Sequence, residues 1–394
     1  MQLPEPANTN LLFIHNKYLK TGGEDSVVLN EINLLRKHGY SVWLKEFGNE
    51  NFQSTNPLKK ILAGFNFFFN LSAFFSVYRL IKKHKIKVLH THNFFYTASP
   101  AVFWAGKLAG AKTVMTIHNY RLFCLNALFY REGGTCMDCV NSRSFRPGIH
   151  HACFKASPTF SAILAASLQF HRKAGTWLHK VDRFIVLNPF TKELLQGIGV
   201  NGEKITVKSN FITDTAYADY QNRNNTYLYA GRIEEEKGIR HLIEAFQQSG
   251  RKLLIAGDGN MVPYIKENTS ETIQYIGQQT PEQIAVLFQQ CKGFIFPSLL
   301  TEGMPMTLIE AFAAGAISIA AASVNTSSMI SDGTDGFLYE GGNVASLNQA
   351  IGRLEALDLS SLQILSGNAR KRYENHYHES IHLVTIRNIY TNED

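Results

Sequence analysis

Short strand-like segments alternate with helical segments along the whole chain, and this alternation restricts the fold more than any other feature. In the first half, the strand-like segments are LLFIHN (11–16), YSVWLKEF (40–47), KVLHTH (87–92) and AKTVMTIHN (111–119). The alternation resumes in the second half with TYLYAGRI (226–233). Strands joined by helices pair in parallel and carry helices on both faces of the sheet. We therefore expect an α/β protein built from doubly wound parallel sheets.

The length of the chain and one polar stretch indicate two domains. At 394 residues, the chain is longer than a single hydrophobic core usually supports, and 45% of its residues are hydrophobic. The stretch TDTAYADYQNRNN interrupts the alternation and indicates a linker at residues 213–225. We expect one domain over residues 1–212, a second over residues 226–375, and a final helical segment over residues 376–394.

Two carboxylates, Glu302 and Glu310, lie eight positions apart in PSLLTEGMPMTLIEAFAAG, which indicates a strand end, a glycine turn and the first turns of a helix. Because two helical turns take about 7.2 residues, both carboxylates can face one ligand at the helix N-terminus. Sugar and ribose hydroxyls bind such acceptors. The alternative is a turn carboxylate and a solvated helix face. It is weakened because Glu310 precedes the small apolar run AFAAGA, where a lone charge needs a partner.

The turn between the two carboxylates is suited to an anion. Gly303, Met304 and Pro305 form it, and they precede the predicted helix directly. Backbone N–H groups in such a turn can face an anionic ligand, and the helix dipole adds partial positive charge there. A sugar linked to a nucleotide diphosphate fits this combination of acceptors and donors.

Two cations follow another strand of the second half. In TYLYAGRIEEEKGIRHLIEAF, an apolar strand leads into Gly231 and Arg232, and Lys237 stands near the start of the next helix. A forked guanidinium and an ammonium group near helix N–H groups bind phosphate oxygens well. The alternative is that Lys237 is merely solvated and that Arg232 pairs with the acidic residues 234–236. The strand end LLIAGDGN adds a second glycine turn at Gly257, which is weak evidence by itself.

Taken in order, these motifs resemble the donor-binding half of a retaining glycosyltransferase of the GT-B fold, in the family 4 group known as glycosyl transferases group 1. The resemblance extends to the first half through YLKTGGED (18–25), IKVLHTHNFF (86–95) and AKTVMTIHNYR (111–121). It implies two Rossmann-like domains that face each other across a cleft. In this fold the end of the chain often crosses back to the first domain, as we expect for residues 376–394.

The resemblance implies a role for each matching residue. Glu302 would bind hydroxyls of the donor sugar, and Glu310 would bind the ribose. Arg232 and Lys237 would neutralise the diphosphate, and His118 would lie beside the transferred sugar. The remaining donor-binding residues would be Gly22 and Gly23 from the first domain, with Gly231, Gly257, Gly303, Met304 and Pro305 from the second.

Charge development at the leaving group explains why cations are needed. Breaking the bond between sugar and phosphate puts negative charge on the leaving oxygen, which prepositioned cations stabilise more in the transition state than in the ground state. The chain contains no aspartate pair of the D-x-D type. We therefore expect Arg232 and Lys237, and no catalytic metal, to carry this charge. Retention of configuration is implied by the family, with front-face attack and the leaving phosphate oxygen as proton acceptor.

Charge is distributed unevenly between the two halves. Residues 1–200 contain 24 Lys and Arg against 10 Asp and Glu, a balance of +14, whereas the rest of the chain has a balance of −7. A basic first half suits an anionic membrane surface or a diphosphate-bearing lipid acceptor. We expect no nucleic-acid partner, because no recognised nucleic-acid-binding module is present.

The segment KKILAGFNFFFNLSAFFSVYRLIKKHKIK (59–87) supports a membrane role, because basic residues flank a run rich in phenylalanine. We expect a helix whose aromatic face lies in the membrane interface, although packing of these rings on the sheet is an equal alternative. A membrane-spanning helix is disfavoured because Asn66, Asn70, Ser72 and Ser76 interrupt the run. The N-terminus lacks the features of a signal peptide, so we expect a cytoplasmic protein, peripheral at the inner face of the membrane.

Four of the five cysteines fall in one insertion near residues 122–156: Cys124, Cys136, Cys139 and Cys153. In a cytoplasmic protein, thiolates this close in sequence suggest a structural zinc ion more than disulfides. His150 or His151 could replace one cysteine, and reactive thiols are the alternative. A subset of the family that the chain resembles carries a similar insertion.

The function expected from the sequence is transfer of a hexose or similar sugar from UDP or GDP to a glycan or lipid-linked acceptor, in envelope or exopolysaccharide synthesis. A related enzyme with a small-molecule acceptor is the alternative among enzymes. The alternative from another class is a catalytically silent scaffold that binds a nucleotide sugar within a polysaccharide assembly complex.

Overall fold

A computed structural model describes residues 9–17, 23–48 and 66–391 of the chain. The chain divides into two compact units. The first contains residues 1–127, 137–210 and 382–394, and the second contains residues 128–136 and 211–381. The stretch 213–225, expected as a linker, therefore belongs to the second unit. Tyr220 explains this, because its ring is buried and its hydroxyl donates to the Lys292 carbonyl at 2.8 Å.

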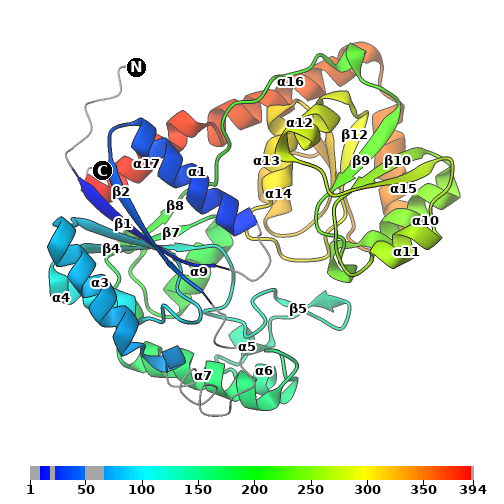
Figure 1. The fold of residues 1–394 in the computed structure, drawn as a ribbon. Helices are drawn as coiled ribbons and strands as arrows, with labels where there is room; N and C mark the ends of the chain where they lie inside the picture. Colours follow the sequence, from blue (N-terminus) through cyan, green and yellow to red (C-terminus); the bar gives the residue numbers. More distant parts are fainter. Residues whose placement is uncertain (1–8, 18–22, 49–65, 392–394) are drawn as a thin grey trace. The chain divides into compact units, whose positions relative to one another are not determined.

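The first unit is built on a six-stranded parallel sheet with the order β2-β1-β3-β4-β7-β8. Its strands are β1 Asn10–Asn16, β2 Ser41–Phe47, β3 Val88–Asn93, β4 Lys112–Ile117, β7 Arg183–Val186 and β8 Ile205–Val207. Helices cover both faces of this sheet, with α1 and α17 on one face and α3 and α4 on the other (Figure 1). The helices are α1 Gly23–Lys37, α3 Leu71–His84, α4 Ala101–Ala109, α7 Pro158–Lys173, α8 Thr176–His179, α9 Pro189–Gly197 and α17 Glu379–Thr391.

Two local sequence features decide helix boundaries in this unit. Asn70 accepts a hydrogen bond from the Ala73 N–H and so caps α3, which begins at Leu71 within the phenylalanine-rich segment. The helical segment 158–179 is divided into two helices. Gly175 adopts a left-handed conformation with φ of 67° and separates α7 from α8.

The insertion of the first half contains only short elements. These are β5 Tyr130–Arg131, β6 Gly134–Thr135, α5 Asp138–Asn141 and α6 Arg146–His150. The β5–β6 hairpin groups with the second unit and the two helices with the first, whereas the sequence suggested a single insertion in the first domain.

The second unit has a six-stranded parallel sheet with the order β11-β10-β9-β12-β13-β14. Its strands are β9 Thr226–Ala230, β10 Lys252–Ala256, β11 Ile273–Gly277, β12 Gly293–Phe296, β13 Ser318–Ala321 and β14 Gly336–Tyr339. The helices are α10 Ile239–Ser249, α11 Val262–Glu267, α12 Pro281–Gln290, α13 Met306–Ala313, α14 Thr326–Met329, α15 Val344–Glu355 and α16 Leu359–His376, with the short 3-10 helix η4 Glu235–Lys237 before α10.

Separate hydrophobic cores lie on the two faces of the second sheet. Ile243 of α10 and Leu347 of α15 belong to one core, and Phe288 of α12, Phe312 of α13 and Tyr373 of α16 belong to the other. Both sheets therefore have the doubly wound architecture that the alternation of segments predicts. In each sheet the chain order reverses next to its first strand, between β1 and β3 and between β9 and β12. Such a switch point, at the carboxyl ends of the strands, is where ligands bind in open α/β sheets.

Candidate active site

A carboxylate, an ammonium group and a hydroxyl meet at the switch point of the second unit. Lys237, in the turn that follows β9, forms an ion pair with Glu302, in the loop that follows β12. Ser298 donates a hydrogen bond to the same Glu302 oxygen at 2.7 Å. The side chains of Lys237 and Glu302 remain 14% and 17% exposed, so a ligand can reach both. The structure thus brings together two of the residues predicted from sequence.

The charge state of Glu302 follows from these neighbours. Burial by itself would raise the pKa of Glu302, but Lys237, the Ser298 hydroxyl and Arg232 together lower that pKa below its usual value. Arg232 is exposed and forms no ion pair among the residues that the structure describes. The alternative was that Arg232 pairs with an acidic residue in the range 234–236. Of these residues, Glu235 pairs with Arg240 instead, at 2.7 Å. Arg232 is therefore available to a ligand beside an ionised carboxylate.

Glycine is required where the loops of this site pass each other. Gly257 has φ of 144°, and a Cβ placed on it would lie 1.9 Å from the Gly231 carbonyl oxygen. Gly238, which follows Lys237, has φ of 75°, and its Cβ would lie 2.1 Å from the Pro297 carbonyl oxygen. A side chain at either position would force the turns after β9, β10 and β12 apart. The glycines thus set how closely the polar groups of the three turns approach.

The helix α13 begins directly after the turn of Gly303, Met304 and Pro305. Pro305 occupies the N-cap position, and the carbonyl group of Glu302 accepts a hydrogen bond from the Asn325 side chain, which holds the turn. Glu310 lies on the second turn of α13, and burial raises its pKa to about 7. A carboxyl group with this pKa gains from hydrogen-bond donors that a ligand brings.

In the first unit, His118 follows β4 at the carboxyl edge of the sheet. Its Nε2 lies 2.9 Å from Nδ1 of His92, on the adjacent strand β3. Burial lowers the pKa of both rings, to about 3 for His92 and well below the usual value for His118. Both histidines are therefore neutral at physiological pH. Gly23 is the first residue of α1, and Gly22 lies outside the described residues.

A buried network behind His92 was not anticipated from the sequence. Glu31 of α1 is 1% exposed, and one of its oxygens accepts from Lys208 at 3.1 Å and lies 2.9 Å from His382 of α17. Its other oxygen lies 3.2 Å from His90 Nδ1 and 3.5 Å from His92 Nε2. One feature of the sequence could have indicated the network: a glutamate lies in the apolar stripe of α1, four residues after Val27. His90 and His92 are both buried.

The predicted zinc site at the cysteines of the insertion stays a prediction. Among the described residues, the group of three or more potential metal ligands whose atoms lie within 4.8 Å of one another consists of Glu31, His90 and His92. Cys124 is buried with its sulfur 2.9 Å from the Asn126 side-chain oxygen, which directs it to a local partner.

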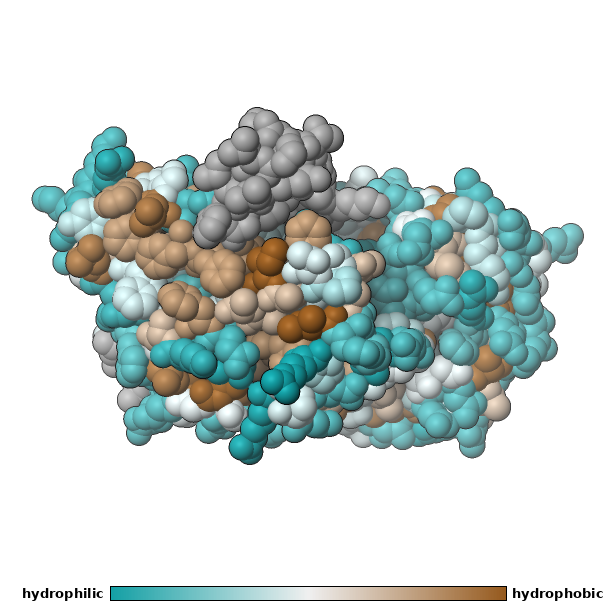
Figure 2. Space-filling model, turned by 90° about the horizontal axis from the view of Figure 1, so that it is seen from below, coloured by the Kyte–Doolittle hydropathy of each residue, from teal (hydrophilic) through white to brown (hydrophobic). Residues whose placement is uncertain are grey.

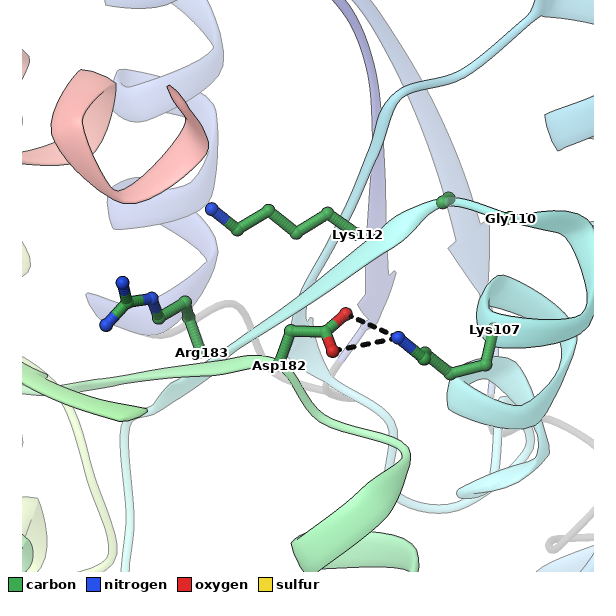
Figure 3. A pocket seen from close by; sticks show the side chains of 6 residues that line it. Lys107, Gly110, Lys112, Asp182 and Arg183 are labelled. Atoms are coloured by element: carbon green, nitrogen blue, oxygen red, sulfur yellow. Dashed lines mark hydrogen bonds and ion pairs between the residues drawn. The ribbon is translucent and has the colours of Figure 1, made fainter. Parts of the chain in front are cut away.

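A surface pocket of about 380 Å³ lies at the opposite edge of the first sheet, where β4 and β7 begin. Figure 3 shows its basic side chains, with Lys107 paired to Asp182 at 2.8 Å. Lys112 donates to the carbonyls of Ile389 and Tyr390 at the end of α17, and Arg183 donates to the Glu203 carbonyl. These cations are engaged within the protein, so we do not place the active site here.

Comparison with known proteins finds a matching family for each half of the chain. The family Glycosyltransferase Family 4 matches residues 21–215, and the family Glycosyl transferases group 1 matches residues 218–372. The chain is 26% identical to the lipopolysaccharide 1,6-galactosyltransferase of Escherichia coli K12 over 55% of this chain and 64% of that protein. It is 23% identical to the Escherichia coli UDP-Gal:alpha-D-GlcNAc-diphosphoundecaprenol alpha-1,3-galactosyltransferase over 82% and 79% of the two chains. For three of the curated relatives, the match spans only 20%, 33% and 64% of their length.

Solved structures share the fold over nearly the whole chain. Anabaena HepE in complex with UDP and glucose is 15% identical, with a TM-score of 0.66 over 98% of this chain and 100% of that chain. The sucrose-phosphate synthase of Thermosynechococcus elongatus is 16% identical, with a TM-score of 0.70 over 98% of each chain. The two family matches follow one another along the sequence, and both units have the expected parallel sheets. The chain therefore belongs to the family 4 group of glycosyltransferases with the GT-B fold.

Proposed function

We propose that the protein is a retaining glycosyltransferase that moves a sugar from UDP or GDP to a glycan or lipid-linked acceptor during envelope or exopolysaccharide synthesis. The observation that carries this proposal is the group of Lys237, Glu302 and Ser298 at the switch point of the second unit, with Arg232 exposed beside it. Cations and a carboxylate acceptor side by side match a ligand that carries both a diphosphate and sugar hydroxyls.

Each group has a proposed role. Arg232 and Lys237 bind the diphosphate and stabilise the charge on the leaving oxygen. Glu302 accepts hydrogen bonds from donor-sugar hydroxyls, and Glu310 accepts them from the ribose. His118 contacts the transferred sugar. The backbone of the turns at Gly23, Gly231, Gly257, Gly303, Met304 and Pro305 completes donor binding, together with Gly22.

The proposed chemistry uses no enzymic nucleophile and no catalytic metal. The acceptor hydroxyl attacks the anomeric carbon on the face from which the diphosphate leaves, and the leaving phosphate oxygen takes the hydroxyl proton. The bond from sugar to phosphate breaks while the bond from sugar to acceptor oxygen forms, so configuration is retained. The two cations supply the charge stabilisation that a divalent ion supplies elsewhere. Transfer should therefore persist in excess EDTA.

The relatives support the proposed donor and acceptor classes. Anabaena HepE was solved with UDP and glucose, and curated relatives are named for lipopolysaccharide, O-antigen and diphosphoundecaprenol substrates. These names favour UDP as the first donor nucleotide to test and a diphosphate-linked lipid as the first acceptor. The basic charge balance of residues 1–200 suits such an anionic acceptor.

The deciding experiment measures binding and turnover separately. Calorimetry with UDP and GDP identifies the nucleotide, and release of that nucleotide from a panel of its sugars measures turnover. We expect Glu302→Gln and Arg232→Ala to abolish detectable turnover, whereas Lys266→Ala, an exposed lysine of the same unit, should leave it unchanged. Nucleotide binding without turnover on any donor or acceptor would instead support the scaffold function.

We also propose that the first unit binds an anionic membrane surface. Apolar side chains gather on one of its faces, as Figure 2 shows. Leu71 and Phe75 of α3 are 61% and 50% exposed, and Phe160 and Phe170 of α7 are 42% and 52% exposed. The segment just before α3 contacts α7, since the Phe68 carbonyl lies 2.6 Å from a ring nitrogen of His171.

Basic residues lie beside this apolar face. The last turn of α3 contains Lys82 and Lys83, and the last turn of α7 contains Arg172 and Lys173. Buried apolar rings combined with cations near anionic headgroups are the two contributions on which interfacial binding depends. No helix among the described residues has the length and apolar character to cross a bilayer. On the basis of the apolar face and the cations beside it, we propose that the protein is peripheral at the inner face of the cytoplasmic membrane.

Vesicle sedimentation tests the membrane proposal. We expect binding to vesicles that contain phosphatidylglycerol, and much weaker binding to vesicles of phosphatidylcholine alone. The double variant Phe75→Ser and Phe170→Ser should bind less, while the control Leu359→Ser, an exposed apolar residue of the second unit, should bind normally. Equal binding by both variants would contradict the assignment to this face.

A further inference from the structure

A chain of three side chains leads from the core of the first unit to the carboxyl edge of its sheet. Glu31 Oε1 lies 3.5 Å from His92 Nε2, and His92 Nδ1 lies 2.9 Å from His118 Nε2. The rings of His92 and His118 are nearly parallel, with an angle of 20° between them. Glu31 and His92 are 1% and 4% exposed, so water does not intervene freely. Each contact in this chain therefore needs a donor on one side and an acceptor on the other.

The charge states at the two ends fix what each ring must do. Burial alone would raise the pKa of Glu31, but Lys208 and hydrogen bonds from His382 and His90 hold that pKa well below its usual range. Glu31 is thus a carboxylate and can only accept. Both His92 and His118 are neutral because burial lowers their pKa. Each ring accordingly has one N–H and one bare nitrogen, and the question is which nitrogen has the proton.

The direction of the chain follows from Glu31. His92 Nε2 is buried and has no hydrogen-bond partner of good geometry among the described residues, and the Glu31 oxygen lies 3.5 Å from it. A bare nitrogen there would place two lone pairs face to face in a dry interior, whereas an N–H would be attracted to the carboxylate. With its proton on Nε2, His92 must accept at Nδ1. His118 must then donate from Nε2.

We infer that Glu31 and His92 position His118 as a hydrogen-bond acceptor, with its proton held on Nε2 and Nδ1 left bare for a hydroxyl of the substrate. In the described part of the chain, no side chain or backbone group forms a hydrogen bond with His118 Nδ1. His118 is partly exposed at this edge. A neutral acceptor at this position selects ligands that present an O–H there and disfavours a deoxy analogue.

A metal ion in the same cluster would reverse this arrangement. Glu31, His90 and His92 could act as ligands, in which case His92 Nε2 would be bare and its Nδ1 would donate to His118. His118 would then have its proton on Nδ1. The charges argue against a cation here, because Lys208 already neutralises Glu31 in a fully buried setting. The two arrangements predict opposite tautomers, so one measurement separates them.

The test is the tautomeric state of His118 in the full-length protein at pH 7, read from long-range 1H–15N correlations after 15N-histidine labelling. His118→Gln and His92→Phe assign the two signals among 14 histidines, and His151→Gln, an exposed position, is the control. We expect a single Nε2–H tautomer for both rings in the wild type, and mixed tautomers for His118 in His92→Phe. A proton on Nδ1 of His118, or a stoichiometric metal that is present in the wild type and absent from His92→Phe, would overturn the inference.

The role of His118 as a substrate contact rests on the proposed function, and a second assay keeps the two claims apart. Sugar transfer should fall at least tenfold in His118→Gln and less in His92→Phe, in which the ring of His118 remains. If the tautomer is as inferred but His118→Gln transfers sugar normally, the proposed function of His118 fails and the positioning stands. If transfer is lost but the proton is on Nδ1, the positioning by Glu31 and His92 fails.

Discussion

Both units place a lysine against a glutamate near the switch point of a parallel sheet, but the two pairs differ in their surroundings. Glu31 and Lys208 have side chains 1% and 4% exposed, and Glu31 is contacted by side chains on both of its oxygens. Lys237 and Glu302 are 14% and 17% exposed. A carboxylate that protein encloses on all sides positions its neighbours, whereas one that is open to water on one side is available to a ligand. The comparison predicts that Glu31 acts mainly on stability and Glu302 mainly on activity.

The largest effect should come from removing the buried carboxylate. Glu31→Ala leaves Lys208 buried without its counter-ion, and such a change costs about 3–5 kcal/mol of unfolding free energy. Because the pKa of Glu31 is lowered in the folded state, its stabilisation is present at neutral pH and is lost as the pH falls through that lowered pKa. Urea unfolding at pH 7 measures the difference. Glu193→Ala, on the exposed face of α9, is the control.

A second variant shows whether the loss arises from the unpaired lysine. Replacing both partners, as Glu31→Leu with Lys208→Met, removes the buried charges together and should recover most of the lost stability. If the double variant is as unstable as Glu31→Ala, the histidine contacts of Glu31, and not its charge balance, carry the stability.

The next largest effect is expected on activity, for the pair of Lys237 and Glu302, which is open to water on one side. Lys237→Met should lower the turnover rate by about 10²–10³, the usual cost of losing one group that stabilises developing negative charge. The unfolding free energy should change little, because the remaining Glu302 keeps partial access to water. Initial rates with a saturating donor, combined with urea unfolding, measure both quantities. A stability loss as large as that of Glu31→Ala would break the distinction between the two pairs.

The pH dependence of donor binding sharpens the contrast further. Burial raises the pKa of Glu310 to about 7, so its carboxylate fraction falls below pH 7. If the carboxylate binds the ribose, affinity for the donor should weaken by up to about tenfold per pH unit as the pH falls below that value. Calorimetry with a UDP-sugar suits this test, because the ligand has no phosphate monoester that titrates near pH 6. Glu310→Gln should bind weakly at every pH.

The smallest effect is expected for a fully solvated pair. Arg240 and Glu235 have side chains 51% and 56% exposed, although they lie as close as 2.7 Å. Arg240→Ala should change the unfolding free energy by less than about 1 kcal/mol, because exposed ion pairs are screened by water and salt. Thermal and urea unfolding measure it. A larger loss would show that the exposed fraction of an ion pair does not predict how much that pair contributes to the stability of this protein.

The sequence predicted the sheets, and it singled out Lys237 and Glu302 as separate site residues, because both inferences rest on local signals. Strand periodicity, the glycine turn at Gly231 and the spacing of Glu302 and Glu310 all lie within short segments. The ion pair of Lys237 and Glu302 was not predicted; it forms because the turns after β9 and β12 adjoin at the switch point. The strand order itself could not be read from the sequence without the family resemblance.

The buried network was missed because its members are distant in sequence. Glu31 and Lys208 are 177 residues apart, and His90 and Tyr390 are 300 residues apart. No local pattern reports such a pairing, and a single glutamate in the apolar stripe of α1 was the one available sign.

The position of α17 has a consequence for how the protein is made. Its residues His382 and Tyr390 contact Glu31 and His90, which the ribosome produces hundreds of residues earlier. Until the last helix emerges, the nascent first unit contains a charged group without its full set of partners. Domains that fold during synthesis usually do so from the N-terminus onward. Here the first unit cannot be completed before α17 is made, so termination near residue 381 leaves the first half of the protein incomplete as well.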